Sequence, residues 1–205
     1  MKTEIYLLRH AEPMNCYFPS NENKQIANEK IPLSVNGEKS AEQLFKSNFF
    51  NDIDLVVSSS YVRSISTAKY LLKNKVELLI NPLFNERKLG DEEREPEFWL
   101  QQLYDQSIKN TNGESQLEVR NRMFAGIGEL LSKNLYKKIA IVSHGMAITF
   151  LLMNWCKLED ANLDGKVRKL SFNGKTIIND RIKYLDIFKL VFVDNKIVSI
   201  EKLSI

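Results

Sequence analysis

The chain has 205 residues, 43% of them apolar and 27% charged, which is an ordinary composition for a globular protein with a sizeable core. Its net charge of +3 and the absence of a basic stripe argue against a nucleic-acid-binding protein. No stretch has the ~20 apolar residues of a membrane span, and none has the pattern of a signal peptide. The two cysteines, Cys16 and Cys156, suggest no disulfide framework, so we expect a cytoplasmic protein.

Strand and helix patterns alternate along the chain. Short apolar runs predict strands at Glu4–Leu8, Asp54–Ser58, Val76–Ile80 and Lys138–Ser143. Apolar residues at helical spacing predict helices that begin at Ser34 and run through Phe45, then Tyr61–Leu72, Ser115–Lys133 and Met146–Trp155. In the third of these helices, one face is predicted to carry Leu117, Met123, Ile127 and Leu130. A terminal hairpin is predicted from Phe188–Val193 and Lys196–Glu201 around Asp194-Asn195.

This alternation predicts a single α/β domain over residues 1–205. The expected architecture is a three-layer sandwich with a mostly parallel central sheet, helices on both faces and a C-terminal antiparallel hairpin. Two segments, Pro13–Pro32 and Asn85–Gly113, show no clear pattern. Long loops inside a compact domain often cover a functional site, so specificity is expected in these two segments.

Polar side chains follow the four predicted parallel strands. His10 follows the first strand and His144 the fourth, while Arg63 and Glu86 follow the second and third. Ligands of open α/β sheets bind beyond the carboxyl ends of the strands, so these side chains are expected at one edge, together with Arg9. Since arginine, histidine and helix N-termini commonly hold anions, the pattern predicts an anion site, and phosphate is its simplest ligand.

The same residues resemble the motifs of a known family, the phosphoglycerate mutase-like histidine phosphatases. Leu8-Arg9-His10 with Glu12 is similar to the family signature. Further similar elements follow in order along the chain: Pro32-Leu33-Ser34 with Gly37, Ser58-Ser59-Ser60 through Arg63 with Thr67-Ala68, Glu86 with Gly90, Gly113-Glu114-Ser115, and Ser143-His144-Gly145. The last 50 or so residues carry little of this resemblance.

The resemblance implies the role of each residue. His10 would attack phosphorus, Glu86 would be the general acid and base, and His144 would assist catalysis and hold a phosphoryl oxygen. Arg9 and Arg63 would clamp the phosphoryl group, so that no metal and no other cofactor is expected. Ala11 stands where many members have glycine. Cys16 stands where some members have a phosphate-binding asparagine, and Asn15, one residue earlier, is the alternative ligand.

Three functions are compatible with this pattern. A phosphomonoesterase that acts on a small phosphorylated metabolite is favoured. A cofactor-dependent phosphoglycerate mutase would use the same residues, but this chain is short for one and lacks an arginine-rich segment after Glu86 that would bind a carboxylate. A non-catalytic phosphate-binding module is the third possibility, because a fold does not fix a function. The substrate and the oligomeric state are left open, and no nucleic-acid or membrane partner is expected.

Overall fold

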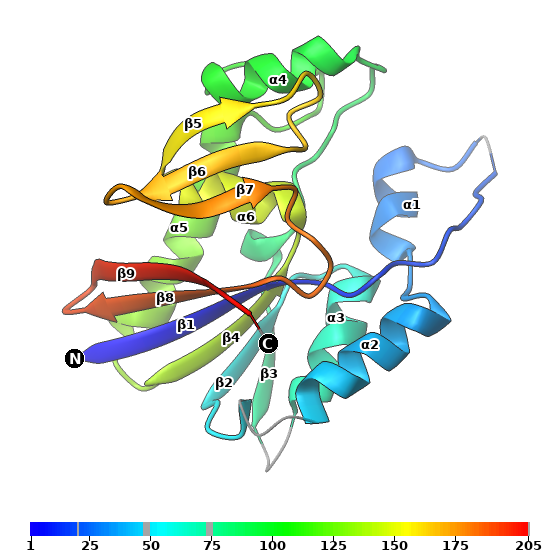
Figure 1. Cartoon of the computed structure of the whole chain (residues 1–205). Coiled ribbons are helices and arrows are strands. Elements are labelled where there is room, and N and C mark those ends of the chain that lie inside the picture. Colours follow the sequence, from blue (N-terminus) through cyan, green and yellow to red (C-terminus); the bar gives the residue numbers. More distant parts are fainter. Residues whose placement is uncertain (20, 47–49, 73–75, 205) are drawn as a thin grey trace.

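The computed structural model describes residues 1–19, 21–46, 50–72 and 76–204, and its main sheet has six strands in the order β3-β2-β4-β1-β8-β9 (Figure 1). The four parallel strands are β1 (Lys2–Arg9), β2 (Leu55–Ser58), β3 (Glu77–Ile80) and β4 (Lys138–Ser143). The terminal hairpin of β8 (Ile187–Val193) and β9 (Lys196–Leu203) joins β1 in antiparallel pairing. The predicted parallel sheet and antiparallel hairpin are confirmed.

The predicted helices are present on the two faces of this sheet. They are α2 (Val35–Lys46), α3 (Val62–Ala68), α5 (Gln116–Ser132) and α6 (Gly145–Leu152). The stretch predicted as one helix from residue 61 to 72 continues after α3 as a short 3-10 turn, η2 (Lys69–Leu71), and a second turn, η3 (Pro82–Phe84), follows β3. The helix predicted to reach Trp155 ends at Leu152. No helix in the described ranges is long and apolar enough to cross a membrane.

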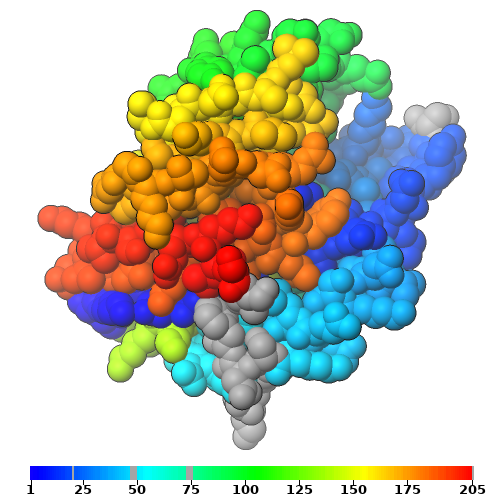
Figure 2. Space-filling model, in the orientation of Figure 1, coloured from blue at the N-terminus to red at the C-terminus, as the bar shows by residue number. Residues whose placement is uncertain are grey.

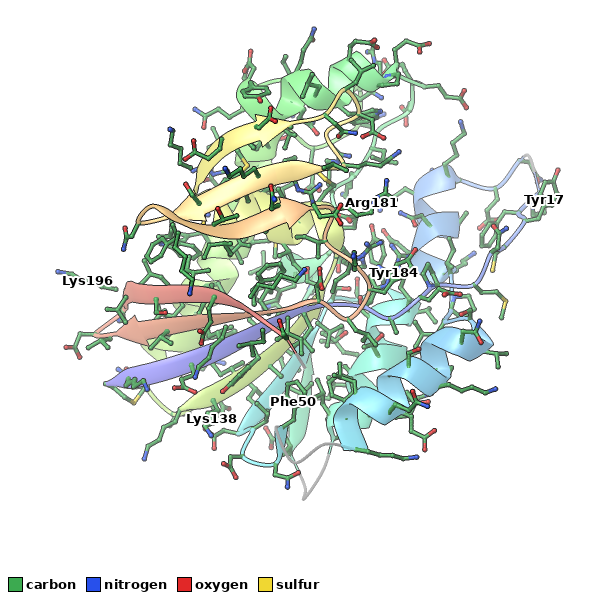
Figure 3. The ribbon with its side chains drawn as sticks, viewed as in Figure 1. Tyr17, Phe50, Lys138, Arg181, Tyr184 and Lys196 are labelled. Carbon is green, nitrogen blue, oxygen red and sulfur yellow. The ribbon has the colours of Figure 1, made fainter. Side chains whose placement is uncertain are left out.

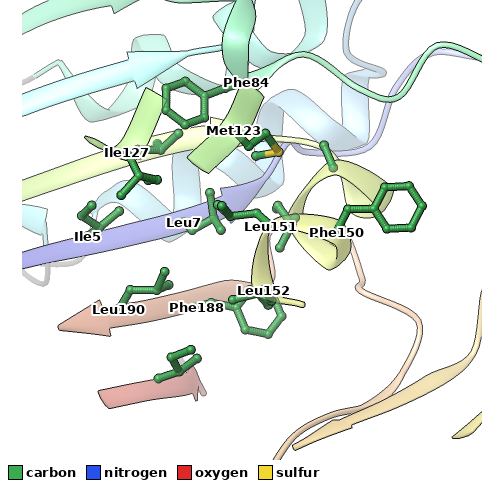
Figure 4. Packing of buried hydrophobic residues seen from close by; sticks show 14 of the residues in the cluster. Ile5, Leu7, Phe84, Met123, Ile127, Phe150, Leu151, Leu152, Phe188 and Leu190 are labelled. Atoms are coloured by element: carbon green, nitrogen blue, oxygen red, sulfur yellow. The ribbon is translucent and has the colours of Figure 1, made fainter. Parts of the chain in front are cut away.

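Side-chain alternation along the central strands divides the core into two layers. From β1, Ile5 and Leu7 point to the face covered by α5 and α6, where they join Met123 and Leu151 (Figure 4). Tyr6 and Leu8 of β1, with Val56 of β2, point to the opposite face, which is covered by α2 and α3. Because both faces are covered by helices, the middle of each of these strands is apolar on both sides, which is why they appear as continuous apolar runs in the sequence.

Some expectations for the fold were wrong. The two segments expected as loops each contain a helix, α1 (Lys24–Lys30) and α4 (Pro96–Tyr104). Leu117 is 39% exposed, and Val119 is the residue of that turn that enters the core. A separate antiparallel sheet, not predicted, consists of β5 (Lys157–Ala161), β6 (Arg168–Phe172) and β7 (Lys175–Asp180). Figure 2 shows this small sheet, in yellow and orange, above the terminal hairpin in red.

Candidate active site

The side chains expected to form a site lie at the carboxyl ends of the four parallel strands. His10 directly follows β1 and is 4% exposed. Its Nδ1 lies 2.7 Å from the carbonyl oxygen of Ala11, which can only accept a hydrogen bond, so Nδ1 carries the proton. The lone pair is therefore on Nε2. The ring is thus held in the tautomer that a nucleophilic histidine needs.

Ala11, the residue whose carbonyl orients His10, is held by α3 through its amide. The amide of Ala11 donates to Thr67 Oγ1 at 3.0 Å, and that hydroxyl donates to the carbonyl of Arg63 at 2.8 Å, one turn earlier in the helix. The amide of His10 donates to the carbonyl of Ser143 at 3.0 Å, at the end of β4. Two neighbouring elements therefore fix both peptide groups beside the ring.

Arg63 connects the two histidines of the chain. Its Nε donates to His10 Nε2 at 3.2 Å, and its Nη2 lies 3.4 Å from His144 Nδ1. The Nη1 group donates to the carbonyl of Asn28 in α1. The guanidinium is buried and also lies 4.7 Å from the ring centre of Tyr61.

The two histidines lie side by side, with ring centres 5.0 Å apart. His144 is fully buried, and its Nε2 lies 2.8 Å from Ser59 Oγ and 3.2 Å from Ser64 Oγ. Because Arg63 can only donate, His144 Nδ1 is the acceptor and Nε2 carries the proton. Burial, followed by nearby positive charge, holds the pKa of each histidine well below its ordinary value, and for His10 that charge comes from Arg63 and Arg9.

Glu86 is held at the N-terminus of α6. Its Oε1 accepts from the amides of Arg87 and Ala147, both at 2.9 Å, and its Oε2 accepts from the amide of Met146 at 3.3 Å. Amides in the first turn of α6 thus donate hydrogen bonds to this carboxylate, as expected from the preference of helix N-termini for anions. Glu86 therefore has a fixed position above the strand ends.

A cavity of about 250 Å³, which we call the His10 cavity, is lined by the groups expected to act, except His144. It is lined by Arg9, His10, Pro13, Asn28, Ile31, Arg63, Glu86, Arg87, Leu89 and Met146. The Arg9 guanidinium donates to the carbonyl of Ile182 and stacks on Tyr184, 4.1 Å from the ring centre. His144 does not line this cavity but lies beneath Arg63, so its expected contact with a phosphoryl oxygen stays a prediction.

The structure does not bring Asn15 to the site. Asn15 is exposed and lies outside the residues that line the His10 cavity, so nothing supports it as a phosphate ligand. The side chains missed from the sequence are Asn28, Arg87 and Tyr184. Arg87 is 7% exposed and donates to Gln102 Oε1, and its position directly after Glu86 was the only signal for it.

The sequence of this chain resembles those of known proteins. The sequence profile of the histidine phosphatase superfamily (branch 1) matches residues 5–182. The chain belongs to this superfamily. Among its relatives are a probable phosphoglycerate mutase from Proteus mirabilis, 27% identical over 161 residues and 73% of each chain, and an uncharacterized phosphatase, PhoE, from Bacillus subtilis, 30% identical over 155 residues, which are 73% of this chain and 76% of that one.

Solved structures with the superfamily fold resemble the whole chain. A putative alpha-ribazole-5'-P phosphatase from Escherichia coli is 21% identical with a TM-score of 0.65, covering 98% of this chain and 95% of that one. A mycobacterial glucosyl-3-phosphoglycerate phosphatase complexed with VO3 is 19% identical with a TM-score of 0.68, covering 98% and 97%. At this identity the likeness establishes the fold of the superfamily and leaves the substrate open.

Among the residues that the structure describes, no group of three or more His, Cys, Asp or Glu side chains could hold a metal ion. The cationic side chains that line the His10 cavity are Arg9, Arg63 and Arg87.

Proposed function

We propose that this histidine phosphatase superfamily member is a phosphomonoesterase that hydrolyses a small phosphorylated metabolite through a phosphohistidine on His10. The observation that carries the proposal is the state of His10: Nδ1 donates to the Ala11 carbonyl, and Nε2 keeps a lone pair that faces the Arg63 guanidinium. A neutral imidazole beside two arginines is suited to attack an anionic phosphorus centre, because the arginines neutralise the charge of the phosphoryl oxygens.

The proposed reaction has two steps. First, the Nε2 lone pair of His10 attacks phosphorus, the bond between phosphorus and the ester oxygen breaks, and Glu86 gives a proton to the leaving oxygen. Then a water molecule gives a proton to Glu86 and attacks the phosphohistidine. The P–N bond breaks, which releases inorganic phosphate and restores neutral His10. Arg9 and Arg63 hold the phosphoryl oxygens in both steps.

A trapping experiment tests this proposal. The enzyme is mixed briefly with ³²P-labelled substrates and quenched in alkali, where a phosphoramidate is stable although acid destroys it. We expect label on the wild-type protein and none on His10→Ala, together with loss of phosphate release, and we expect activity to persist in EDTA. Comparable turnover by His10→Ala would show that water or another residue is the nucleophile. Activity that chelation abolishes and Mg²⁺ or Zn²⁺ restores would contradict the metal-independent mechanism.

The relatives named as probable phosphoglycerate mutases support a second candidate. A mutase would return the phosphoryl group of His10 to an acceptor hydroxyl instead of water. Assays of 3-phosphoglycerate with and without 2,3-bisphosphoglycerate separate the two functions. A phosphatase releases phosphate without the bisphosphate, whereas a mutase forms 2-phosphoglycerate and depends on it.

A further inference from the structure

A second cavity, which we call the Arg168 cavity, adjoins the His10 cavity. Its volume is about 260 Å³, and it is lined by Arg9, Glu86, Gly145, Met146, Lys166, Arg168, Arg181 and Ile182. It shares Arg9, Glu86 and Met146 with the His10 cavity. The two cavities are therefore neighbours at the ends of the parallel strands.

Arg168 is held in place by backbone groups. It belongs to β6 of the small sheet and is 4% exposed. Its Nη1 donates to the carbonyls of Gly165 at 3.0 Å and Lys166 at 2.7 Å, and its Nη2 donates to the carbonyl of Gly145 at 3.3 Å. Its Nε is buried without a partner. Burial lowers the pKa of Arg168 to about 10, which leaves the guanidinium charged at neutral pH.

The lining of the Arg168 cavity has an excess of positive charge, with four cationic side chains and one carboxylate. Across the described ranges, no carboxylate forms an ion pair with Arg9, Arg168 or Arg181, whereas Lys166 pairs with Asp164 at 2.9 Å. Among the residues that the structure describes, Glu86 is the only acid that lines the cavity, and its oxygens accept from backbone amides. A buried cation is costly unless an anion is nearby, so the cavity is suited to an anionic ligand.

Arg181 gives the cavity an accessible cation. It is exposed and directly follows β7, on the segment that leads to Tyr184 and β8 (Figure 3). In Figure 2 this segment, in orange, lies beside the N-terminal residues in blue. The unpredicted small sheet therefore supplies Arg168, and the segment after it supplies Arg181, beside the ends of the parallel strands.

We infer that the substrate carries a second anionic group, a carboxylate or a phosphate, which Arg168 and Arg181 bind while the phosphoryl group lies at His10. This inference rests on the proposed function, since it concerns the substrate of the same site. The planar guanidinium groups offer paired donors that match the oxygens of a carboxylate or phosphate. Arg9, which lines both cavities, lies between the two anionic groups.

Matched substrate pairs test the inference. Two pairs differ in a carboxylate against a hydroxymethyl group: 3-phosphoglycerate against glycerol 3-phosphate, and 6-phosphogluconate against sorbitol 6-phosphate. A third pair, glucose 1,6-bisphosphate against glucose 6-phosphate, replaces the carboxylate with a phosphate. We expect kcat/KM for phosphate release to favour the anionic member of at least one pair by ~10-fold or more, as one or two charge-assisted hydrogen bonds provide.

Variants of Arg181 and Arg168 test whether these residues cause the preference for the anionic substrate. Arg181→Gln is expected to reduce the preference for the anionic member to less than ~3-fold, because the charge of Arg181 is lost. Arg181 is exposed, so this variant is expected to fold. Arg168→Lys is expected to lower the preference partly, because the charge remains while the planar fork is lost. Lys169→Gln is the control: Lys169 is the exposed neighbour of Arg168 on β6 and lines neither cavity. This variant is expected to keep both the activity and the preference.

Two results would overturn the inference: equal kcat/KM for both members of every pair, or a preference that survives in Arg181→Gln and Arg168→Lys. If no phosphomonoester is hydrolysed, the proposed function fails instead. Calorimetric titration of the same pairs then still measures the subsite, because tighter binding of the anionic member and its loss in Arg181→Gln do not require turnover.

Discussion

Arg63 donates from Nε to Nε2 of His10 across 3.2 Å, so the guanidinium holds the same nitrogen that we propose attacks phosphorus. An arriving phosphoryl group must replace this hydrogen bond. When its oxygens take the guanidinium donors, the lone pair of Nε2 is released toward phosphorus. Nη2 of the same guanidinium lies 3.4 Å from His144 Nδ1, which gives Arg63 a second fixed contact beside His10.

Arg63→Lys tests the importance of this geometry. Lysine keeps the charge but cannot contact His10, His144 and the Asn28 carbonyl from one rigid plane. We expect kcat/KM to fall by ~10²-fold or more, the scale for loss of one oriented transition-state donor. Arg120→Lys is the control, because Arg120 is partly buried and donates to two side chains but does not line the His10 cavity. A near-normal Arg63→Lys enzyme would place Arg63 outside the phosphate clamp.

The two buried histidines predict how stability depends on pH. Burial holds the pKa of His10 and of His144 well below the value of about 6.5 that each has in the unfolded chain. Below that pH the unfolded chain therefore binds more protons than the folded protein, and the free energy of unfolding falls as pH falls. Each histidine contributes up to about 1.4 kcal/mol per pH unit.

The chain contains only these 2 histidines, so urea unfolding between about pH 5 and pH 6.5 isolates them from most carboxylates. His10→Asn keeps a donor for the Ala11 carbonyl and removes one titrating ring. Its slope of unfolding free energy against pH is expected to be lower by up to about 1.4 kcal/mol per pH unit, with the largest difference toward pH 5. An unchanged slope would mean that His10 titrates normally in the folded protein.

The candidate site could be predicted from the sequence because it depends on local order. The carboxyl ends of parallel strands share one edge of the sheet, so a polar residue that follows a strand lies at this edge for any loop conformation. His10, Arg63 and Glu86 therefore line one cavity. Tyr184 could not be found in this way. It reaches Arg9 from a segment far along the chain, where Leu185 has a φ of 63° and no repeating pattern is present.

The small sheet was missed because its strands are short, polar and irregular. β5 and β6 both have shifts in register, and most positions of β5 and β7 are not buried, so no clean alternation results. One signal was available: Asn173-Gly174, both with positive φ, is the two-residue turn that joins β6 to β7. The helix α4 had a comparable signal in Pro96 at its first turn.

Gly37→Ala tests the close approach of α2 to the segment after His10. A Cβ at Gly37 would lie 2.2 Å from the carbonyl oxygen of Glu12, which accepts from the amide of Ser34 at 2.9 Å. Backbone must move to relieve this contact, so we expect a loss of ~1–3 kcal/mol in the free energy of unfolding and lower activity, because the displaced segment includes Ala11.

Gly128→Ala is the control for Gly37→Ala. Gly128 lies in α5, and nothing is within 4 Å of the position of a new Cβ. Alanine there should stabilise the protein by about 0.5–1 kcal/mol through better helix formation. Urea unfolding and kcat/KM of both variants check the pair. If both substitutions had the same effect, the contact with Glu12 would not be what requires glycine.

The role of Glu86 as the general acid is tested by the basicity of the leaving group. A leaving alkoxide is strongly basic and needs a proton as the P–O bond breaks, whereas a nitrophenolate can depart without one. Glu86→Gln leaves an oxygen for the amides of Arg87 and Ala147 but cannot give up a proton. It should therefore slow phosphorylation of His10 by ~10²–10⁴-fold for alkyl phosphates and far less for p-nitrophenyl phosphate. Pre-steady-state rates are required, because the later hydrolysis step also uses Glu86 and would slow both substrates alike. Glu97→Gln, exposed on α4, controls for the loss of one negative charge. Equal losses for the two substrates in the first step would show that another group protonates the leaving oxygen, and Glu86 would then serve only to orient the N-terminus of α6.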